Sequence, residues 1–250
     1  MPNSSPILIV GGFGSNWQQY RELRELLIQV SGRHVAIAPL ALFDWAGVVA
    51  SDSYGALLRI LAKAVDDLLS ECGTPYATLV AHSAGGVLAR IYMGDQPYGP
   101  RKLCYHGFRK VSCLATLGTP HSASKRGRQG GLNQIVFVQA TYPGSYWRFI
   151  HYISVIGRGI YGVRDGPPPE RGAYQSYGLL TGEGAQWGDG VVPLANGLLD
   201  GSRHAVLDGL RHDPRPDRPW YGQDEPTVRE WWRVVEEAER EPTAGVRLAE

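Results

Sequence analysis

The sequence predicts an α/β protein with a central, mostly parallel sheet of about six strands. Short apolar runs alternate along the chain with segments whose apolar residues recur at helical spacing. This alternation is the order expected for strand–helix–strand units on a parallel sheet. Several of the apolar runs contain almost no polar residue, as expected for strands that helices cover on both faces. The length of 250 residues favours a single domain over 1–250, because a chain of this size can bury one large core.

Apolar runs between turn residues mark the expected strands. These runs lie at 6–10, 34–38, 77–82, 111–117, 149–156 and 204–208. Between them, Leu and Val residues recur at i, i+3, i+4 and i+7, the spacing of a helix face that packs on a sheet. The spacing predicts helices around 23–30 and 57–69, and a last helix around 228–235, where Pro226 suits the first helical turn.

Two stretches interrupt this alternation, and we interpret both as insertions rather than as a second domain. Residues 122–148 carry aromatic side chains without a clean period. The aromatic stretch 142–152 is typical either of core packing or of a lid above the carboxyl edge of the sheet. Residues 157–172 contain three consecutive prolines and several glycines, which predict a mobile loop.

Charge and cysteine content narrow the classes of function. The formal net charge is +1 and the sequence pI is about 7.8, so we expect no nucleic-acid partner. Cys72, Cys104 and Cys113 are widely spaced and form no CxxC pair, which indicates free thiols rather than a zinc site or a disulfide framework. Free thiols, with no signal-peptide pattern at the N-terminus, favour the cytoplasm. The longest uncharged stretch, 129–147, is too polar to span a membrane, so we expect no stable membrane insertion.

The strongest motif lies where the third predicted strand gives way to a helix. Residues 79–89 read LVAHSAGGVLA, with Ser83 between small residues. In a nucleophile elbow the serine occupies such a turn, and the positions two before and two after it must be small because strand and helix nearly touch there. Ala81 and Gly85 meet this need, although the usual pattern has Gly at both positions. The alternative is a serine that merely lies at a strand-to-helix turn. Side chains of adjacent residues diverge, so His82 cannot be its base, and we expect His82 to have a core or supporting role.

Two motifs carry a resemblance to a known family. Residues 81–86, AHSAGG, resemble the elbow of lipases and esterases of the α/β-hydrolase family, among which small bacterial lipases also have Ala at the first position. Residues 117–121, LGTPH, are similar to a segment of the same lipases. The resemblance extends from Ile7 to about Tyr221 and is weakest between 122 and 174. It implies the α/β-hydrolase fold and a carboxylic ester hydrolase that works through a Ser-His-Asp triad and an acyl-enzyme intermediate.

The resemblance also guides the choice of base. A serine hydroxyl is a poor nucleophile at neutral pH and needs a base to accept its proton. In this fold the triad runs Ser, acid, His along the chain, with His on the loop beyond the last strand. His212 occupies that loop, whereas His204 lies at the start of the strand. The alternative for His212 is a solvated loop histidine.

For the acid of the triad, Asp189 is the first candidate. It stands between two glycines in the segment 187–193, WGDGVVP, and GDGVVP resembles the acid loop of lipases. The alternative is an aspartate that serves only as a helix N-cap. Glu183 is the reserve candidate, and Asp208 is less suited because it lies inside the last predicted strand.

The resemblance places the oxyanion hole at the backbone N–H groups of Phe13 and Ala84. Glycines beside Phe13, in the segment 10–14, VGGFG, let the backbone approach a substrate carbonyl closely. A dinucleotide-binding fingerprint is the competing interpretation of this Gly-rich turn. It would need a third glycine at position 17, which is Trp17.

These observations together predict an esterase or lipase that takes a small-molecule or lipid ester and needs no cofactor and no metal. We expect a monomer. Two alternatives stay open. The same triad would serve a thioesterase or an acyltransferase, and the chain could instead be a hydrolase-fold binding protein that has lost catalysis.

Overall fold

The computed structural model describes residues 5–124, 132–215 and 218–243. Its centre is a six-stranded sheet in the order β2-β1-β3-β4-β5-β8, and every pairing in this sheet is parallel. The strands are β1 Ile7–Val10, β2 Val35–Ile37, β3 Ala77–His82, β4 Val111–Leu117, β5 His151–Arg158 and β8 Arg203–Asp208. The prediction of about six mostly parallel strands is confirmed, and each predicted strand agrees with the observed bounds to within two residues.

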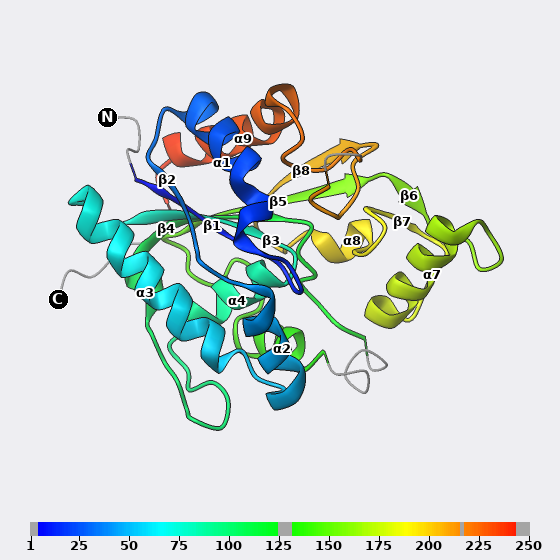
Figure 1. Ribbon diagram of the computed structural model, residues 1–250, viewed down its shortest axis with the longest axis horizontal. Helices are drawn as coiled ribbons and strands as arrows, with labels where there is room; N and C mark the ends of the chain where they lie inside the picture. Colours follow the sequence, from blue (N-terminus) through cyan, green and yellow to red (C-terminus); the bar gives the residue numbers. More distant parts are fainter. Residues whose placement is uncertain (1–4, 125–131, 216–217, 244–250) are drawn as a thin grey trace.

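Helices cover both faces of this sheet (Figure 1). They are α1 Arg21–Ser31, α2 Leu42–Ser51, α3 Gly55–Cys72, α4 Ala84–Tyr92, α6 Asn133–Thr141, α7 Pro168–Thr181, α8 Leu194–Gly197 and α9 Glu225–Arg240, with short 3₁₀ turns η1 Trp17–Tyr20 and η2 Gly107–Arg109. Helices α1 and α9 pack on one face, while α2, α3, α4 and α6 pack on the other (Figure 1). Among the described residues, no helix combines the length and the apolar character needed to cross a bilayer.

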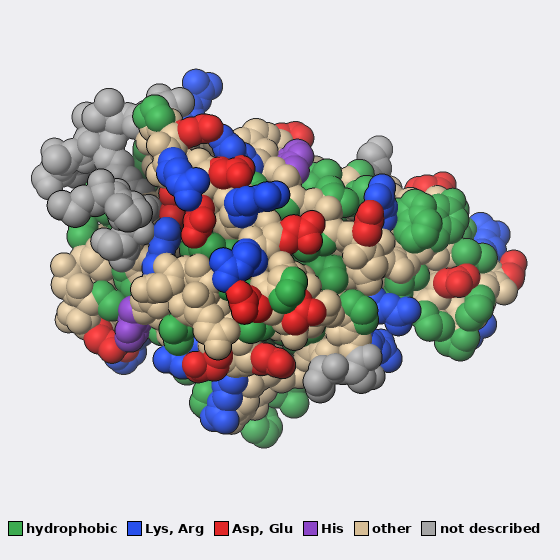
Figure 2. All heavy atoms as spheres, turned by 90° about the horizontal axis from the view of Figure 1, so that it is seen from above, with side chains coloured by type: hydrophobic (Ala, Val, Ile, Leu, Met, Phe, Trp, Pro, Cys, Tyr) green, Lys and Arg blue, Asp and Glu red, His purple; other side chains and the backbone are tan. Residues whose placement is uncertain are grey.

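The sheet separates two apolar cores because successive side chains of a strand point to opposite faces. In β1, Ile7 and Ile9 face α1 and α9, whereas Leu8 and Val10 face the helices on the other side. Helix α9 completes the first core with a buried stripe that includes Trp231. On its outer side, Arg and Glu residues pair one turn apart. Figure 2 shows basic and acidic side chains intermingled over this face of the molecule.

The strand order places the loops that follow β1 and β3 next to each other. The chain moves outward from β1 to β2 and then returns to the other side of β1 to form β3. In open α/β sheets, ligands bind beyond the carboxyl ends of the strands where the order reverses in this way. The segments after Val10 and after His82 therefore meet at the position where such a site is expected.

The segment 157–172 differs from the expected loop. Gly157 and Arg158 end β5, and Ile160–Tyr161 forms β6, which pairs with β7 Trp187–Gly188 in a small antiparallel sheet. Helix α7 begins at Pro168, since proline is well suited to the first helical turn, where its missing N–H costs nothing. The prolines that predicted a loop therefore begin a helix.

The segment 122–148 contains α6, and its residues 125–131 lie outside the described residues. The aromatic side chains of 142–152 contact one another and the core. Tyr142 and Tyr152 are buried, and the Trp147 ring stacks on Phe108 with centroids 4.1 Å apart. These contacts favour core packing for this stretch over the alternative of a lid.

Candidate active site

Ser83 lies at the sharp turn between β3 and α4, with φ = 54° and ψ = −128°. A non-glycine residue in this region is strained and persists only where its surroundings hold it. The Ser83 N–H donates to Leu117 O at 2.8 Å, and Thr119 Oγ1 donates to Ser83 O at 2.9 Å. The segment LGTPH that follows β4 therefore holds the strained turn from the side.

Glycine is required just after Ser83 because the chain is crowded there. A Cβ on Gly85 would lie 2.5 Å from Val10 O and 2.6 Å from Gly11 O, which no real side chain tolerates. A Cβ on Gly12 would lie 2.7 Å from the Ser83 Cβ. The glycines of the VGGFG and AHSAGG motifs thus allow the loop after β1 to touch the start of α4 and the serine itself.

Ser83, His212 and Asp189 form one hydrogen-bonded chain. His212 Nε2 lies 2.8 Å from Ser83 Oγ, and His212 Nδ1 lies 2.7 Å from Asp189 Oδ2. The carboxylate accepts the Nδ1 hydrogen, so Nε2 is free to accept from the serine hydroxyl. The His212 N–H also donates to Asp189 O at 3.0 Å, which joins the two loops through their backbones. The structure therefore brings together the three side chains that the sequence predicts as a triad.

Asp189 lies in a tight turn between β7 and α8. Its Oδ1 accepts from the N–H groups of Val191 and Val192 at 3.0 and 2.7 Å. Gly190 has φ = 104°, a conformation that favours glycine. Helix α8 begins later, at Leu194, and Pro193 is its N-cap residue. The alternative role of Asp189 as the cap of this helix is therefore wrong.

Tyr221 completes the surroundings of the carboxylate. Its hydroxyl donates to Asp189 Oδ2 at 2.7 Å and accepts from the Gly157 N–H at 3.0 Å. Sequence reasoning did not identify Tyr221, because a tyrosine in the loop before α9 carries no local signal of this contact. Two N–H groups, one imidazole and one phenol thus donate to a carboxylate that is only 1% exposed.

Burial and charge together set the protonation of the pair. Burial raises the pKa of Asp189, but the charge of His212 and the hydrogen bonds that the carboxylate accepts lower this pKa by more, so it lies below its usual value. Burial lowers the pKa of His212, but the Asp189 charge and its hydrogen bond raise it, so the net pKa lies above 6.5. Asp189 is therefore ionised at neutral pH and stabilises a proton on the imidazole.

The predicted oxyanion donors lie on either side of Ser83. Ala84 is the first residue of α4, so its N–H is among those at a helix N-terminus without a partner inside the helix. Phe13 follows Gly12 in the loop after β1, which packs closely against Ser83. Phe13 also lines both of the cavities that meet at Ser83. The structure thus places both residues next to Ser83.

Two cavities of different character meet at Ser83. The larger, of about 570 Å³, is mainly apolar and begins at Ser83. Its walls come from four helices and from loops, and include Val48, Val87, Ile135, Leu179, Leu180 and Val192. The smaller, of about 210 Å³, lies on the His212 side and is lined mainly by polar groups such as Ser15, Gln19, Asp213 and Arg215. The serine therefore has an apolar space on one side and a polar space on the other.

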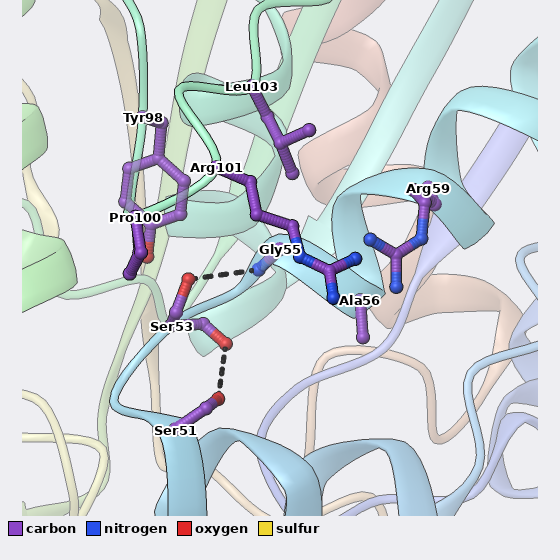
Figure 3. Close-up of a pocket in the computed structure, with 9 residues that line it drawn as sticks. All are labelled: Ser51, Ser53, Gly55, Ala56, Arg59, Tyr98, Pro100, Arg101 and Leu103. Carbon is purple, nitrogen blue, oxygen red and sulfur yellow. Dashed lines mark hydrogen bonds between the residues drawn. The ribbon is translucent and has the colours of Figure 1, made fainter.

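A further cavity, of about 240 Å³, lies beyond the start of α3 and contains no triad residue (Figure 3). Arg59 and Arg101 point toward the same space in it, beside Ser53 and Ala56. The segment Ser51–Gly55 separates it from the apolar cavity, since Asp52 and Tyr54 line one and Ser53 lines the other.

The other candidates are not part of the triad. Glu183 is exposed, and its carboxylate accepts from the Ala185 N–H at 2.9 Å. Asp208 pairs with Arg158 on the surface. His204 Nε2 lies 3.1 Å from Leu199 O, at the start of β8.

In the described part of the chain, no group of three or more His, Cys, Asp or Glu side chains could hold a metal ion. Cys72, Cys104 and Cys113 are free thiols.

Solved structures of other proteins identify the fold. The sequence matches no protein-family model and no curated protein. Among solved structures, the mature lipase BlEst2 of Bacillus licheniformis is similar with a TM-score of 0.60 and 17% identity, over 85% of this chain and 86% of that one. The phospholipase PlaB of Legionella pneumophila, in complex with thio-NAD, gives a TM-score of 0.64 and 13% identity over 96% of this chain. The chain covers 59% of the PlaB chain and 53% of BlEst2 in its propeptide form. At these identities the likeness shows the fold, which is that of the α/β-hydrolases.

Proposed function

Because the chain has the α/β-hydrolase fold, we propose that it is a serine hydrolase that cleaves carboxylic esters. The observation that carries this proposal is the continuous chain from Ser83 Oγ through His212 to Asp189, with heavy-atom distances of 2.8 and 2.7 Å. The chain starts at a strained turn beside a large apolar cavity. These are the geometric roles of nucleophile, base and orienting acid in acyl transfer.

The reaction follows from these positions. Ser83 Oγ attacks the ester carbonyl carbon while His212 Nε2 takes the hydroxyl proton. The carbonyl oxygen becomes an oxyanion, and the N–H groups of Phe13 and Ala84 donate to it. When the intermediate collapses, His212 returns the proton to the departing alcohol, and an acyl group remains on Ser83. Water then attacks the acyl-enzyme and gives a proton to His212. His212 passes this proton to Ser83 Oγ as the bond between the acyl group and Ser83 breaks and the acid leaves.

Asp189 acts through His212 in both halves of the reaction. Its carboxylate fixes the imidazole tautomer with hydrogen on Nδ1 and stabilises the imidazolium that forms when the serine proton is taken. The bonds from Tyr221, Val191 and Val192 keep the carboxylate oriented and ionised in a site that excludes water.

The two cavities support an ester of an apolar acid and a more polar alcohol. An acyl chain fits the apolar cavity beside Ser83, and a leaving alcohol fits the polar side near His212, where protonation of the leaving group takes place. The similar solved structures are named a lipase and a phospholipase, which agrees with a lipid-like ester. A thioester or an acyl acceptor other than water would use the same acyl-enzyme.

Labelling of Ser83 tests this proposal. A fluorophosphonate probe should label one serine of the wild-type chain, identified as Ser83 by peptide mass spectrometry. Ser83→Ala should lose the label, and its turnover of a chromogenic ester should fall about 10⁶-fold. Ser112→Ala is the matched control, because Ser112 lies near the start of β4, where its hydroxyl contacts Ser5 Oγ and Ala77 O, and it lines neither cavity at Ser83. Full hydrolysis by Ser83→Ala would disprove the assignment.

A further inference from the structure

His82 is a buried imidazole beside the nucleophile that the triad does not use. It is 3% exposed, and both of its ring nitrogens have partners. His82 Nε2 lies 2.9 Å from His212 O, and His82 Nδ1 lies 2.9 Å from the Tyr20 hydroxyl. The Tyr20 hydroxyl in turn accepts from the Gly12 N–H at 2.9 Å.

The chemistry of these groups fixes the direction of each hydrogen bond. A carbonyl oxygen only accepts, so His82 Nε2 carries a hydrogen and donates it to His212 O. The neutral ring then has Nδ1 as an acceptor, and the Tyr20 O–H donates to it. Burial, together with the nearby His212, lowers the pKa of His82 to about 3, which keeps the ring neutral. Burial raises the pKa of Tyr20, which keeps its proton.

The chain Gly12–Tyr20–His82–His212 connects the two parts of the site that must be placed relative to Ser83. Gly12 immediately precedes Phe13, whose N–H is the oxyanion donor on the β1 side. His212 carries the base. His82 itself is the residue before Ser83 and the last residue of β3.

Packing leaves this chain little freedom. A Cβ on Gly12 would lie 3.1 Å from His82 Nδ1. The His82 ring lies against the His212 ring with centroids 4.8 Å apart, and the Trp220 ring lies 6.1 Å from the His82 ring and 6.2 Å from the Tyr20 ring. The Tyr20 and His82 side chains border the polar cavity but are both buried, which favours hydrogen bonds within this chain over bonds to water.

We propose that His82 and Tyr20 are positioning residues whose hydrogen-bonded chain holds the oxyanion loop and the backbone of the catalytic histidine at a fixed spacing across Ser83. The inference rests on the proposed function of Ser83 and His212, and it adds two buried side chains that act through the loop of Phe13 and the backbone of His212. Catalysis depends on such spacing, because a displacement of about 1 Å can cost about 10²-fold in rate.

Three variants separate positioning from simple structural support. Tyr20→Phe removes a single oxygen and leaves the ring packing intact. His82→Phe keeps a ring of similar size but removes both nitrogens. His82→Gln retains an amide that can donate and accept, and serves as the conservative rescue. Tyr142→Phe is the matched control, because the Tyr142 hydroxyl also accepts a backbone N–H, from Gln96 at 2.7 Å, but lines neither cavity at Ser83.

The measured quantity is kcat for a chromogenic ester, expressed per active serine. The concentration of active serine is obtained by titrating each variant to completion with fluorophosphonate. Both measurements are made well below the thermal midpoint of the variant. We expect Tyr20→Phe and His82→Phe each to lower kcat about 10- to 100-fold with KM changed less than about threefold. The Tyr20→Phe/His82→Phe double variant should fall no further than the worse single variant, because both interrupt one chain. His82→Gln should recover part of the loss, and Tyr142→Phe should match the wild type.

A merely structural role gives a different result. It would lower the thermal midpoint while kcat per titrated serine stayed within about twofold of the wild type, or the two single effects would multiply in the double variant. Either result overturns the inference. Failure of the proposed function is distinct from both, since the wild type itself would then show no Ser83 label and no Ser83-dependent hydrolysis.

Discussion

Asp189 is almost completely buried, yet each of its carboxylate oxygens accepts two hydrogen bonds. Burial of an ionised carboxylate is costly unless its oxygens are bonded in this way. Backbone N–H groups occupy Oδ1, while His212 and Tyr221 occupy Oδ2. One oxygen thus anchors the carboxylate to its own turn, and the other is directed at His212 and Tyr221.

Asp189→Asn, which replaces one carboxylate oxygen by an NH₂ group, tests these hydrogen bonds. The amide keeps the shape, but an NH₂ group at the Oδ2 position can accept from neither His212 nor Tyr221, so the imidazole loses its tautomer and orientation. We expect kcat for ester hydrolysis to fall about 10⁴-fold while circular dichroism stays native. Glu183→Gln is the matched control and should retain wild-type turnover, because Glu183 lies on the surface. The assignment fails if Glu183→Gln loses activity and Asp189→Asn does not.

The pH dependence of activity follows from His212. The base accepts a proton only when it is neutral, so kcat/KM should rise as pH increases through the pKa of His212. Burial lowers this pKa, but the charge and hydrogen bond of Asp189, together with the charge of Asp213, raise it by more, so the midpoint should lie above 6.5. A pH profile of kcat/KM reports this value for the free enzyme.

Two variants test whether the pH profile reports the titration of His212 rather than that of His204. His204→Ala should leave the midpoint and the turnover near those of the wild type, because His204 lies at the amino end of β8 and contacts Leu199 O. His212→Ala should remove nearly all activity. A wild-type midpoint below pH 6.5 would show that burial outweighs the combined effect of Asp189 and Asp213 on the pKa of His212.

At the scale of elements, the apolar cavity is formed by helices outside the central strands. Helix α2 contributes Val48 and Val49, α4 contributes Val87, and α7 contributes Leu179 and Leu180. The turn at Ser83 is thus held by the sheet and α4, while the space beside it is enclosed largely by helices from separate parts of the chain. The proposed chemistry and the proposed acyl-binding space therefore depend on different elements, except for α4, which contributes to both.

Leu179→Trp tests the cavity as an acyl-binding site. Leu179 is 42% exposed on α7, so a larger ring there narrows the cavity without overpacking the core. We expect kcat/KM to fall about tenfold for the longest acyl chains of a chromogenic ester series, and little for acetate. Val206→Trp is the control, since Val206 is similarly exposed on β8 but does not line the cavity. An equal loss for all chain lengths would show that the acyl group lies elsewhere.

At the scale of the whole molecule, the parallel sheet assembles a site from distant parts of the chain. Ser83 and His212 are 129 positions apart, and Asp189 and His212 are 23 apart. They meet because all six strands end at the same edge, where the strand order reverses between β1 and β3. The cores on both faces hold this edge in place.

The sequence by itself determined the elements that depend on local signals. Nearly uninterrupted apolar runs specify β3 and β4, because strands covered on both faces can carry few polar groups. Small residues around Ser83 specify the strained turn, since a Cβ at position 85 would collide with the backbone after β1. The order of Ser83, Asp189 and His212 along the chain, with the resemblance of AHSAGG and GDGVVP to lipase motifs, predicted which side chains would meet.

Only the tertiary structure decided the groups whose role depends on distant partners. Tyr20 and Tyr221 carry no local pattern, and the position of His82 beside Ser83 predicted only a core or supporting role. Each acquires its contacts through hydrogen bonds to residues far along the chain. The prolines at 167–169 predicted a loop, but they begin α7, whose Ala173, Tyr177 and Leu180 are buried against the rest of the fold. The opposing pKa shifts of Asp189 and His212 likewise exist only once folding removes both groups from water and places them 2.7 Å apart. Local sequence sets backbone conformation, whereas burial and long-range contacts set the electrostatics and shape of the site.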